Sequence, residues 1–141
     1  MSDTTIAKQI VNKMYSGDLF SKWLGIEVLE VTKGFCKLSL KVRKEMLNGF
    51  SILHGGVTFS IADTALAFAS NSHGKISVST EVSISFVEKV HENDILTAIA
   101  KEAHVSEKTG IYFITVSNQN NDNVALLKGT VHRTSKVWVT K

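Results

Sequence analysis

The sequence predicts one α+β domain in which a long, buried helix packs against an antiparallel sheet. Apolar residues recur every four positions near the N-terminus and then alternate, so helices are expected before the first strands. A nearly uncharged segment follows, and four strand-like runs joined by short polar turns complete the chain. Consecutive strands joined by tight turns pair antiparallel, which is typical of the α+β class. With 141 residues and no linker or repeat, we expect a single domain over 1–141, with an N-terminal helical segment over 1–24.

The N-terminal segment is predicted to contain two helices. Ile6, Ile10 and Met14 stand four residues apart, which predicts an amphipathic helix over 4–16. A shorter helical turn is predicted over 18–24, and a glycine follows each of the two segments.

Two strands are predicted next, over 26–32 and 35–42, because apolar and polar residues alternate along both. Lys33-Gly34 between them has the composition of a hairpin turn. Cys36 lies on the apolar face of the second strand, so we expect it in the core as a small hydrophobic residue.

A long helix and four strands make up the rest of the predicted fold. The helix begins after His54-Gly55-Gly56, and its C-terminal cap is expected in the run 71–74. Turns rich in Asn, Asp and Gly separate the final strands. These strands are expected over residues 76–87, 94–105, 111–118 and 124–134.

Composition excludes several classes of protein. A single cysteine excludes a disulfide scaffold and cysteine-based zinc motifs, and the five histidines show no metal-ligand spacing. The N-terminus does not resemble a signal peptide, and polar residues interrupt the apolar segment too often for a membrane span. Lysines such as Lys37, Lys41 and Lys101 stand singly along the predicted strands, whereas a nucleic-acid-binding surface carries a clustered stripe. We therefore expect a cytoplasmic protein that binds no metal, cofactor, nucleic acid or membrane.

Asp63 is the residue that the predicted fold does not explain. It is the only formally charged residue between Glu45 and Lys75, in a helix that is apolar nearly all round and therefore buried. Burying an unpaired carboxylate is unfavourable, and the helix offers no lysine or arginine to neutralise it. Asp63 is either a structural acceptor for serine, threonine or backbone groups, or a catalytic or ligand-binding carboxylate.

The residues at the start of this helix also have two interpretations. Gly55 and Gly56 would let a ligand approach the backbone, and the free N–H groups of a helix N-terminus suit a developing oxyanion. Two glycines before a helix are more commonly a turn, and His54 is more commonly a cap than a catalyst. The sequence has no serine-nucleophile elbow, phosphate-binding glycine loop or dinucleotide fingerprint.

The combination of these residues is more specific than any one of them. Asn48, His54-Gly55-Gly56 and Asp63, with five and six residues between them, resemble the motif of the hot-dog-fold acyl-CoA thioesterases. The resemblance is to the phenylacetate-degradation (PaaI-like) branch in particular, and it covers residues 20–135. It implies a hot-dog fold, in which an antiparallel sheet wraps a long central helix. Other matching segments are Lys108-Thr109-Gly110 and Val131-His132-Arg133.

The resemblance implies hydrolysis of an acyl-CoA thioester to the free acid and CoA, with coenzyme A as part of an aryl- or medium-chain substrate. It implies that Asp63 is the general base or the nucleophile and that the Gly55 backbone N–H polarises the carbonyl. Asn48 and His54 would orient substrate or water. The substrate-binding positions that it implies are Gly56, Thr64, Ser79 and Thr80. The alternative is a non-catalytic hot-dog protein that binds acyl-CoA as a sensor or carrier.

Two segments bear on substrate recognition. Val87-Glu88-Lys89-Val90 stands where members of the family often have Arg-Pro-Gly, so the contacts to the CoA phosphates stay unassigned. Phe50-Ser51-Ile52-Leu53 is expected to shape the acyl pocket.

Helix geometry predicts that the active site is shared between two chains. Gly55 and Asp63 are eight residues apart, which separates them by about 12 Å along one helix. A reacting carbonyl needs both groups within about 3–3.5 Å. Two helices packed antiparallel across a two-fold axis would bring Gly55 of one chain to Asp63 of the other. We therefore expect a homodimer or homotetramer, in agreement with the assembly that the family resemblance implies.

Overall fold

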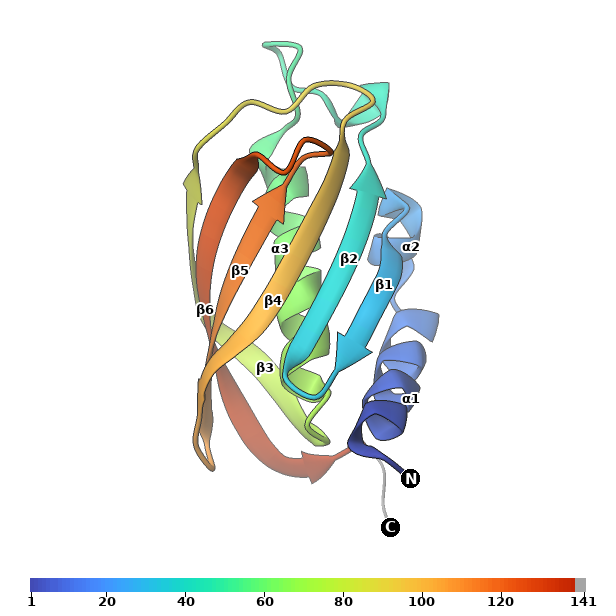
Figure 1. Cartoon of the computed structure of the whole chain (residues 1–141), viewed down its shortest axis with the longest axis vertical. Coiled ribbons are helices and arrows are strands. Elements are labelled where there is room, and N and C mark those ends of the chain that lie inside the picture. The colour runs from blue at the N-terminus through green and yellow to red at the C-terminus, as the bar shows by residue number, and fades with distance from the viewer. Residues whose placement is uncertain (139–141) are drawn as a thin grey trace.

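The computed structural model describes residues 1–138, and its elements follow the predicted order (Figure 1). The last three residues of the predicted domain, 139–141, lie outside the described part. The helices are α1 (Asp3–Ser16), α2 (Leu19–Leu24), a short 3-10 helix η1 (Lys44–Met46) and α3 (Gly55–Asn71). The strands are β1 (Glu27–Thr32), β2 (Phe35–Lys41), β3 (Lys75–Phe86), β4 (Ile95–Val105), β5 (Thr109–Ser117) and β6 (Asn123–Val137).

All six strands belong to one antiparallel sheet in the order β1-β2-β4-β5-β6-β3. Helix α3 lies lengthwise against the sheet and contacts every one of these strands, while α1 and α2 cover the side next to β1 (Figure 1). The prediction of a long central helix wrapped by an antiparallel sheet is confirmed. β3 stands at one edge, where β6 is its partner among the described strands.

Capping residues explain where the N-terminal helices begin and end. The Ser2 hydroxyl accepts from the Thr5 N–H at 3.1 Å, and the Asp18 carboxylate accepts from the Ser21 N–H at 3.0 Å. Helix α2 ends at Gly25, where φ is 85°, and the predicted hairpin turn has Gly34 at φ 77°. Both angles lie in the left-handed region, which favours glycine.

The hydrophobic core fills the space between α3 and the inward face of the sheet. Ile61, Ala65 and Leu66 of α3 are fully buried, as the apolar character of this helix predicts. Cys36 of β2 is also fully buried, and desolvation raises the pKa of its thiol to about 12. Cys36 therefore acts as a small hydrophobic residue, as expected.

Two strands differ from their predicted form. A register shift between Val28 and Glu30 in β1 interrupts the simple alternation and turns Val31 into the core. β6 runs to Val137 instead of ending near residue 134, because its last part pairs with Lys75 at the start of β3. Within residues 1–138, no helix is both long and apolar enough to cross a lipid bilayer.

Candidate active site

Asp63 lies half-buried in the middle of α3 and lines a pocket of about 370 Å³, which we call the Asp63 pocket. Ser79 of β3 lines the same pocket. Among residues 1–138, no hydrogen-bond donor or cation pairs with the Asp63 carboxylate. Desolvation raises its pKa above the ordinary value of 3.8. A structural acceptor would have its donors within the fold, so this environment favours the functional interpretation of Asp63.

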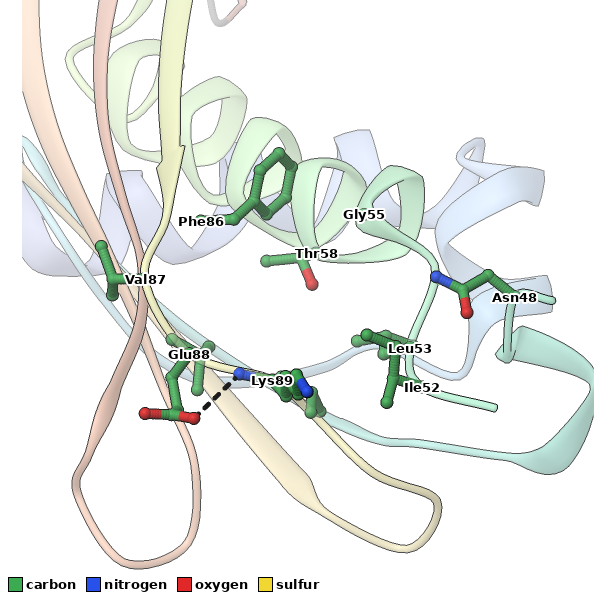
Figure 2. A pocket seen from close by; sticks show the side chains of 11 residues that line it. Asn48, Ile52, Leu53, Gly55, Thr58, Phe86, Val87, Glu88 and Lys89 are labelled. Atoms are coloured by element: carbon green, nitrogen blue, oxygen red, sulfur yellow. Dashed lines mark hydrogen bonds between the residues drawn. The ribbon is translucent and has the colours of Figure 1, made fainter. Parts of the chain in front are cut away.

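Gly55 lines a second pocket, of about 500 Å³, at the N-terminal end of α3 (Figure 2). Because Gly55 is the first residue of the helix, its N–H has no acceptor in the preceding turn. The next two N–H groups are occupied: Gly56 donates to His54 Nδ1 at 2.8 Å, and Val57 donates to the His54 carbonyl at 3.0 Å. In the described part of the chain, the Gly55 N–H has no hydrogen-bond acceptor. The donor implied for the thioester carbonyl is therefore free within residues 1–138, and it belongs to a residue that lines this pocket, which we call the Gly55 pocket.

His54 is the N-cap of α3, in agreement with the more common role of such a histidine. Because Nδ1 accepts the Gly56 N–H, a neutral ring carries its proton on Nε2. That Nε2–H remains a donor for substrate or water. The Gly56 N–H is used in this cap, and the binding of substrate by Gly56 stays a prediction. A Cβ at Gly56 would lie 2.9 Å from His54 Nδ1, which explains the glycine.

Phe86, the last residue of β3, packs directly on Gly55 and is 57% exposed. A Cβ at position 55 would lie 3.0 Å from the Cζ atom and 3.1 Å from the Cε1 atom of its ring. Figure 2 shows the ring beside the first turn of α3, with Thr58 next to it. The aromatic ring therefore flanks the free N–H group, and only glycine fits under it without a displacement.

Asn48 also lines the Gly55 pocket, on the loop that leads into α3. Its Oδ1 accepts from the Phe50 N–H at 2.9 Å, which holds the loop and leaves the amide N–H groups directed at other acceptors. Of the segment expected to shape the acyl pocket, Ile52 and Leu53 line the Gly55 pocket, whereas Phe50 is 85% exposed.

The remaining predicted substrate contacts, Ser79, Thr80 and Thr64, lie in three different places. Of the two candidates on β3, Ser79 lines the Asp63 pocket, while the Thr80 hydroxyl donates to the Thr130 carbonyl at 3.2 Å and lines neither pocket. Thr64 is buried, with its hydroxyl 3.2 Å from that of Ser21 in α2. Its side chain thus joins α3 to α2 in the core and lines neither pocket, and its contact with substrate stays a prediction.

The site geometry thus has two halves on one protomer. Asn48 and Gly55 line one pocket, and Asp63 and Ser79 line the other. Within the described chain, no group of three or more His, Cys, Asp or Glu side chains could hold a metal ion.

Comparison with known proteins identifies the family of this site. The family model described as "Thioesterase superfamily" matches residues 50–125, which is more than half of the chain. The chain belongs to the thioesterase superfamily. It is 40% identical over 127 residues to the acyl-coenzyme A thioesterase PaaI of Escherichia coli K12, with 90% of this chain and 91% of that one covered.

Solved structures agree with this membership. The structure of E. coli PaaI matches with a TM-score of 0.95 and 38% identity, covering 96% of this chain and 99% of that one. A Streptococcus mutans protein bound to acetyl CoA matches with a TM-score of 0.77 and 26% identity, covering 79% of this chain and 90% of that one. The resemblance to the PaaI-like branch is confirmed, and the chain is a thioester hydrolase.

Sequence reasoning missed several residues of this thioesterase that line the two pockets. Thr58 and Phe86 line the Gly55 pocket, and Met14 and Trp138 line the Asp63 pocket. For Thr58 and Met14 the sequence contains a weak signal, namely that each lies on a predicted helix. Phe86 and Trp138 had none, because their position depends on how the ends of β3 and β6 pack against α3.

Proposed function

We propose that the protein is an acyl-CoA thioesterase that hydrolyses aryl- or medium-chain acyl-CoA and acts as a homodimer or a homotetramer. The observation that carries the proposal is the unpaired Asp63 carboxylate in one pocket and the free Gly55 N–H in another on the same helix. Family membership and the names of the relatives support the chemistry, because one is an acyl-coenzyme A thioesterase and another was solved with acetyl CoA.

The assembly that we propose joins the two halves of the site. Gly55 and Asp63 are separated by about two turns of α3, roughly 12 Å, so they cannot both reach one carbonyl. β3 is a twelve-residue edge strand, and a long, unpaired strand edge is a template for a second copy. Antiparallel pairing of two such edges would also set the two α3 helices antiparallel. Gly55 of one chain then meets Asp63 of the other.

In the proposed reaction, the thioester carbonyl accepts a hydrogen bond from the Gly55 N–H of one subunit. The Asp63 carboxylate of the other subunit takes a proton from water while the water oxygen attacks the carbonyl carbon. The C–S bond then breaks, and the CoA thiolate leaves and recovers the proton from Asp63. Alternatively, the carboxylate attacks first and expels the CoA thiolate as the C–S bond breaks, and water then hydrolyses the resulting mixed anhydride, which restores Asp63 and supplies the proton of the thiol. Ser79, which lines the Asp63 pocket, would orient the water.

The experiment that tests the function measures release of free CoA from phenylacetyl-, benzoyl- and octanoyl-CoA. We expect turnover with a kcat/KM of about 10⁴ M⁻¹s⁻¹ or higher for at least one of them. Calorimetric titration with the same compounds is the companion measurement. Saturable binding without release of CoA from any substrate would contradict the proposal in favour of an acyl-CoA sensor or carrier.

A cationic cleft of about 300 Å³ supports a substrate that carries phosphates. Lys75, Lys108 and Arg133 line it, with one carboxylate, Glu107, against these three cations. The Nε atom of Arg133 is buried without a hydrogen-bond partner in the described chain, whereas Nη1 donates to the Ser106 carbonyl. The cleft adjoins the Asp63 pocket through the pairing of β3 with β6. We assign to it the phosphates of CoA.

Replacing Lys108 with Glu is expected to raise KM for the preferred acyl-CoA by about tenfold, with little change in kcat, because a charge-assisted contact to phosphate is lost. The thioester of the same acyl group with pantetheine, which lacks the nucleotide phosphates, should show no such change. Lys41→Glu, at the exposed end of β2, is the matched control. An equal rise of KM for both thioesters would contradict the assignment.

A further inference from the structure

The Asp63 pocket is suited to the acyl part of the substrate, and this inference rests on the proposed function. Met14, Leu66, Ile76 and Val131 give it a largely apolar lining. The Gly55 pocket also has apolar lining residues, among them Leu53 and Phe86, but it carries the charged residues Glu88 and Lys89 as well. A thioester of CoA has one polar arm that stays hydrated and one acyl arm that gains from leaving water. The acyl arm therefore belongs in the Asp63 pocket rather than beside residues 50–53.

Trp138 stands at one end of this pocket. The last part of β6 curves across the base of the molecule toward α1 (Figure 1), and there the backbone N–H of Trp138 donates to the Gly74 carbonyl at 2.9 Å. The indole Nε1–H donates to Asn71 Oδ1 at 2.7 Å. The ammonium group of Lys13 in α1 lies 5.9 Å from the centroid of the ring. Contacts to α1 and to the C-terminal end of α3 with its following turn thus fix the position of the ring.

Asn71 holds the indole of Trp138 in a rigid network of hydrogen bonds. Its Oδ1 also accepts from the Ser77 N–H at 2.9 Å, and its Nδ2 donates to the carbonyls of Ala67 at 2.8 Å and Ser77 at 3.0 Å. The amide is buried, and both its donors and both its acceptor sites are used. The polar edge of the indole is therefore occupied, and the apolar part of the ring is left to line the pocket.

The distance between the Asp63 carboxylate and Trp138 limits the length of the acyl group. Asp63 and Asn71 are eight residues apart on α3, so about 12 Å along the helix separates Asp63 from the residue that holds the indole. The volume of the Asp63 pocket, about 370 Å³, exceeds the roughly 150 Å³ that is enough to hold a benzene molecule. We propose that Trp138 is the closed end of the acyl pocket and sets its preference for aryl- and medium-chain over long-chain acyl groups.

Fluorescence tests this position without any turnover. The chain has two tryptophans, so Trp23→Phe leaves Trp138 as the single reporter. We expect saturation with the octyl thioether of CoA, which cannot be hydrolysed, to change the emission of Trp138, whereas CoA alone does not. In Trp138→Phe, the remaining Trp23 is 69% exposed on α2 and should not respond. Calorimetry confirms saturation. A bound octyl thioether that leaves Trp138 emission unchanged would overturn the proposal.

Chain-length selectivity is the second readout. Trp138→Ala should raise the ratio of kcat/KM for palmitoyl-CoA to kcat/KM for octanoyl-CoA by about tenfold or more, since the wall that excludes the longer chain is removed. Trp138→Phe, which keeps an aromatic wall, and Trp23→Ala should change this ratio less than about twofold. If Trp138→Ala does not fold, as judged by thermal melting, Trp138→Leu replaces it. An unchanged ratio in a folded variant would overturn the proposal, whereas failure of the wild type to bind any acyl-CoA would reject the proposed function itself.

Discussion

Replacing Asp63 with Asn should lower kcat for acyl-CoA hydrolysis by a factor of about 10²–10⁴, the usual contribution of a general base. The amide has nearly the same size as the carboxylate, but it cannot take a proton from water or attack the carbonyl. Because Asp63 has no partner within the described chain, the substitution breaks no hydrogen bond there. Removing a partly desolvated carboxylate should leave the melting temperature unchanged or raise it at neutral pH.

The pH dependence of kcat/KM distinguishes a catalytic role of Asp63 from a structural one. Desolvation favours the protonated form of Asp63 and raises its pKa above 3.8. The reaction needs the ionised form, so kcat/KM should rise with pH through this raised pKa, and the acidic limb should lie above the range of an ordinary aspartate. Asp63→Asn should remove this limb. Asp122→Asn, at an exposed turn before β6, is the matched control. More than a tenth of the wild-type kcat in Asp63→Asn would contradict the assignment.

Most of the fold could be predicted because its signals are local. Apolar residues four positions apart predict α1, alternation predicts β2, and a nearly uncharged apolar run predicts α3. Each of these patterns reflects which side chains are buried in the fold. The long helix also contains the two features that indicate function. Asp63 is a charged residue in a buried helix, and the rise per residue shows that Gly55 lies about 12 Å from it. Both follow from the sequence and elementary geometry.

The parts that could not be predicted depend on contacts between distant segments. Thr64 follows Asp63 in the chain, but adjacent positions on a helix point about 100° apart, so one faces the pocket and the other faces Ser21 in the core. The two candidates on β3 also separate, because the pairing of β3 with β6 shifts register between Ser79 and Glu81, and Thr80 lies at this irregularity. Trp138 enters the site through the extension of β6 and its bond to Asn71, 67 residues away in sequence. No local pattern contains such pairings.

Mixed subunits should reveal whether Gly55 and Asp63 act in different chains. Gly55→Ala places a methyl group 3.0 Å from the Phe86 ring, so the ring or the start of α3 must shift, and kcat should fall by about 10²–10³ as the N–H leaves its position. In a hybrid with Asp63→Asn, one shared site combines the intact glycine of one chain with the intact aspartate of the other. Tag-purified hybrids should therefore recover about half of the wild-type kcat per dimer, since one of two symmetric sites is intact.

The controls separate a shared site from other causes of rescue. Gly17→Ala adds the same methyl group where the nearest neighbouring atom, the Met14 carbonyl oxygen, is 4.0 Å away, so it should keep wild-type activity. A hybrid of Asp63→Asn with the double variant Gly55→Ala, Asp63→Asn contains no intact site under any arrangement and should stay inactive. If each chain held a complete site, the first hybrid would be as inactive as its parents. Hybrids of confirmed composition that show no rescue would therefore place both groups in one chain, and roughly 12 Å of helix would then have to be bridged by a rearrangement of α3.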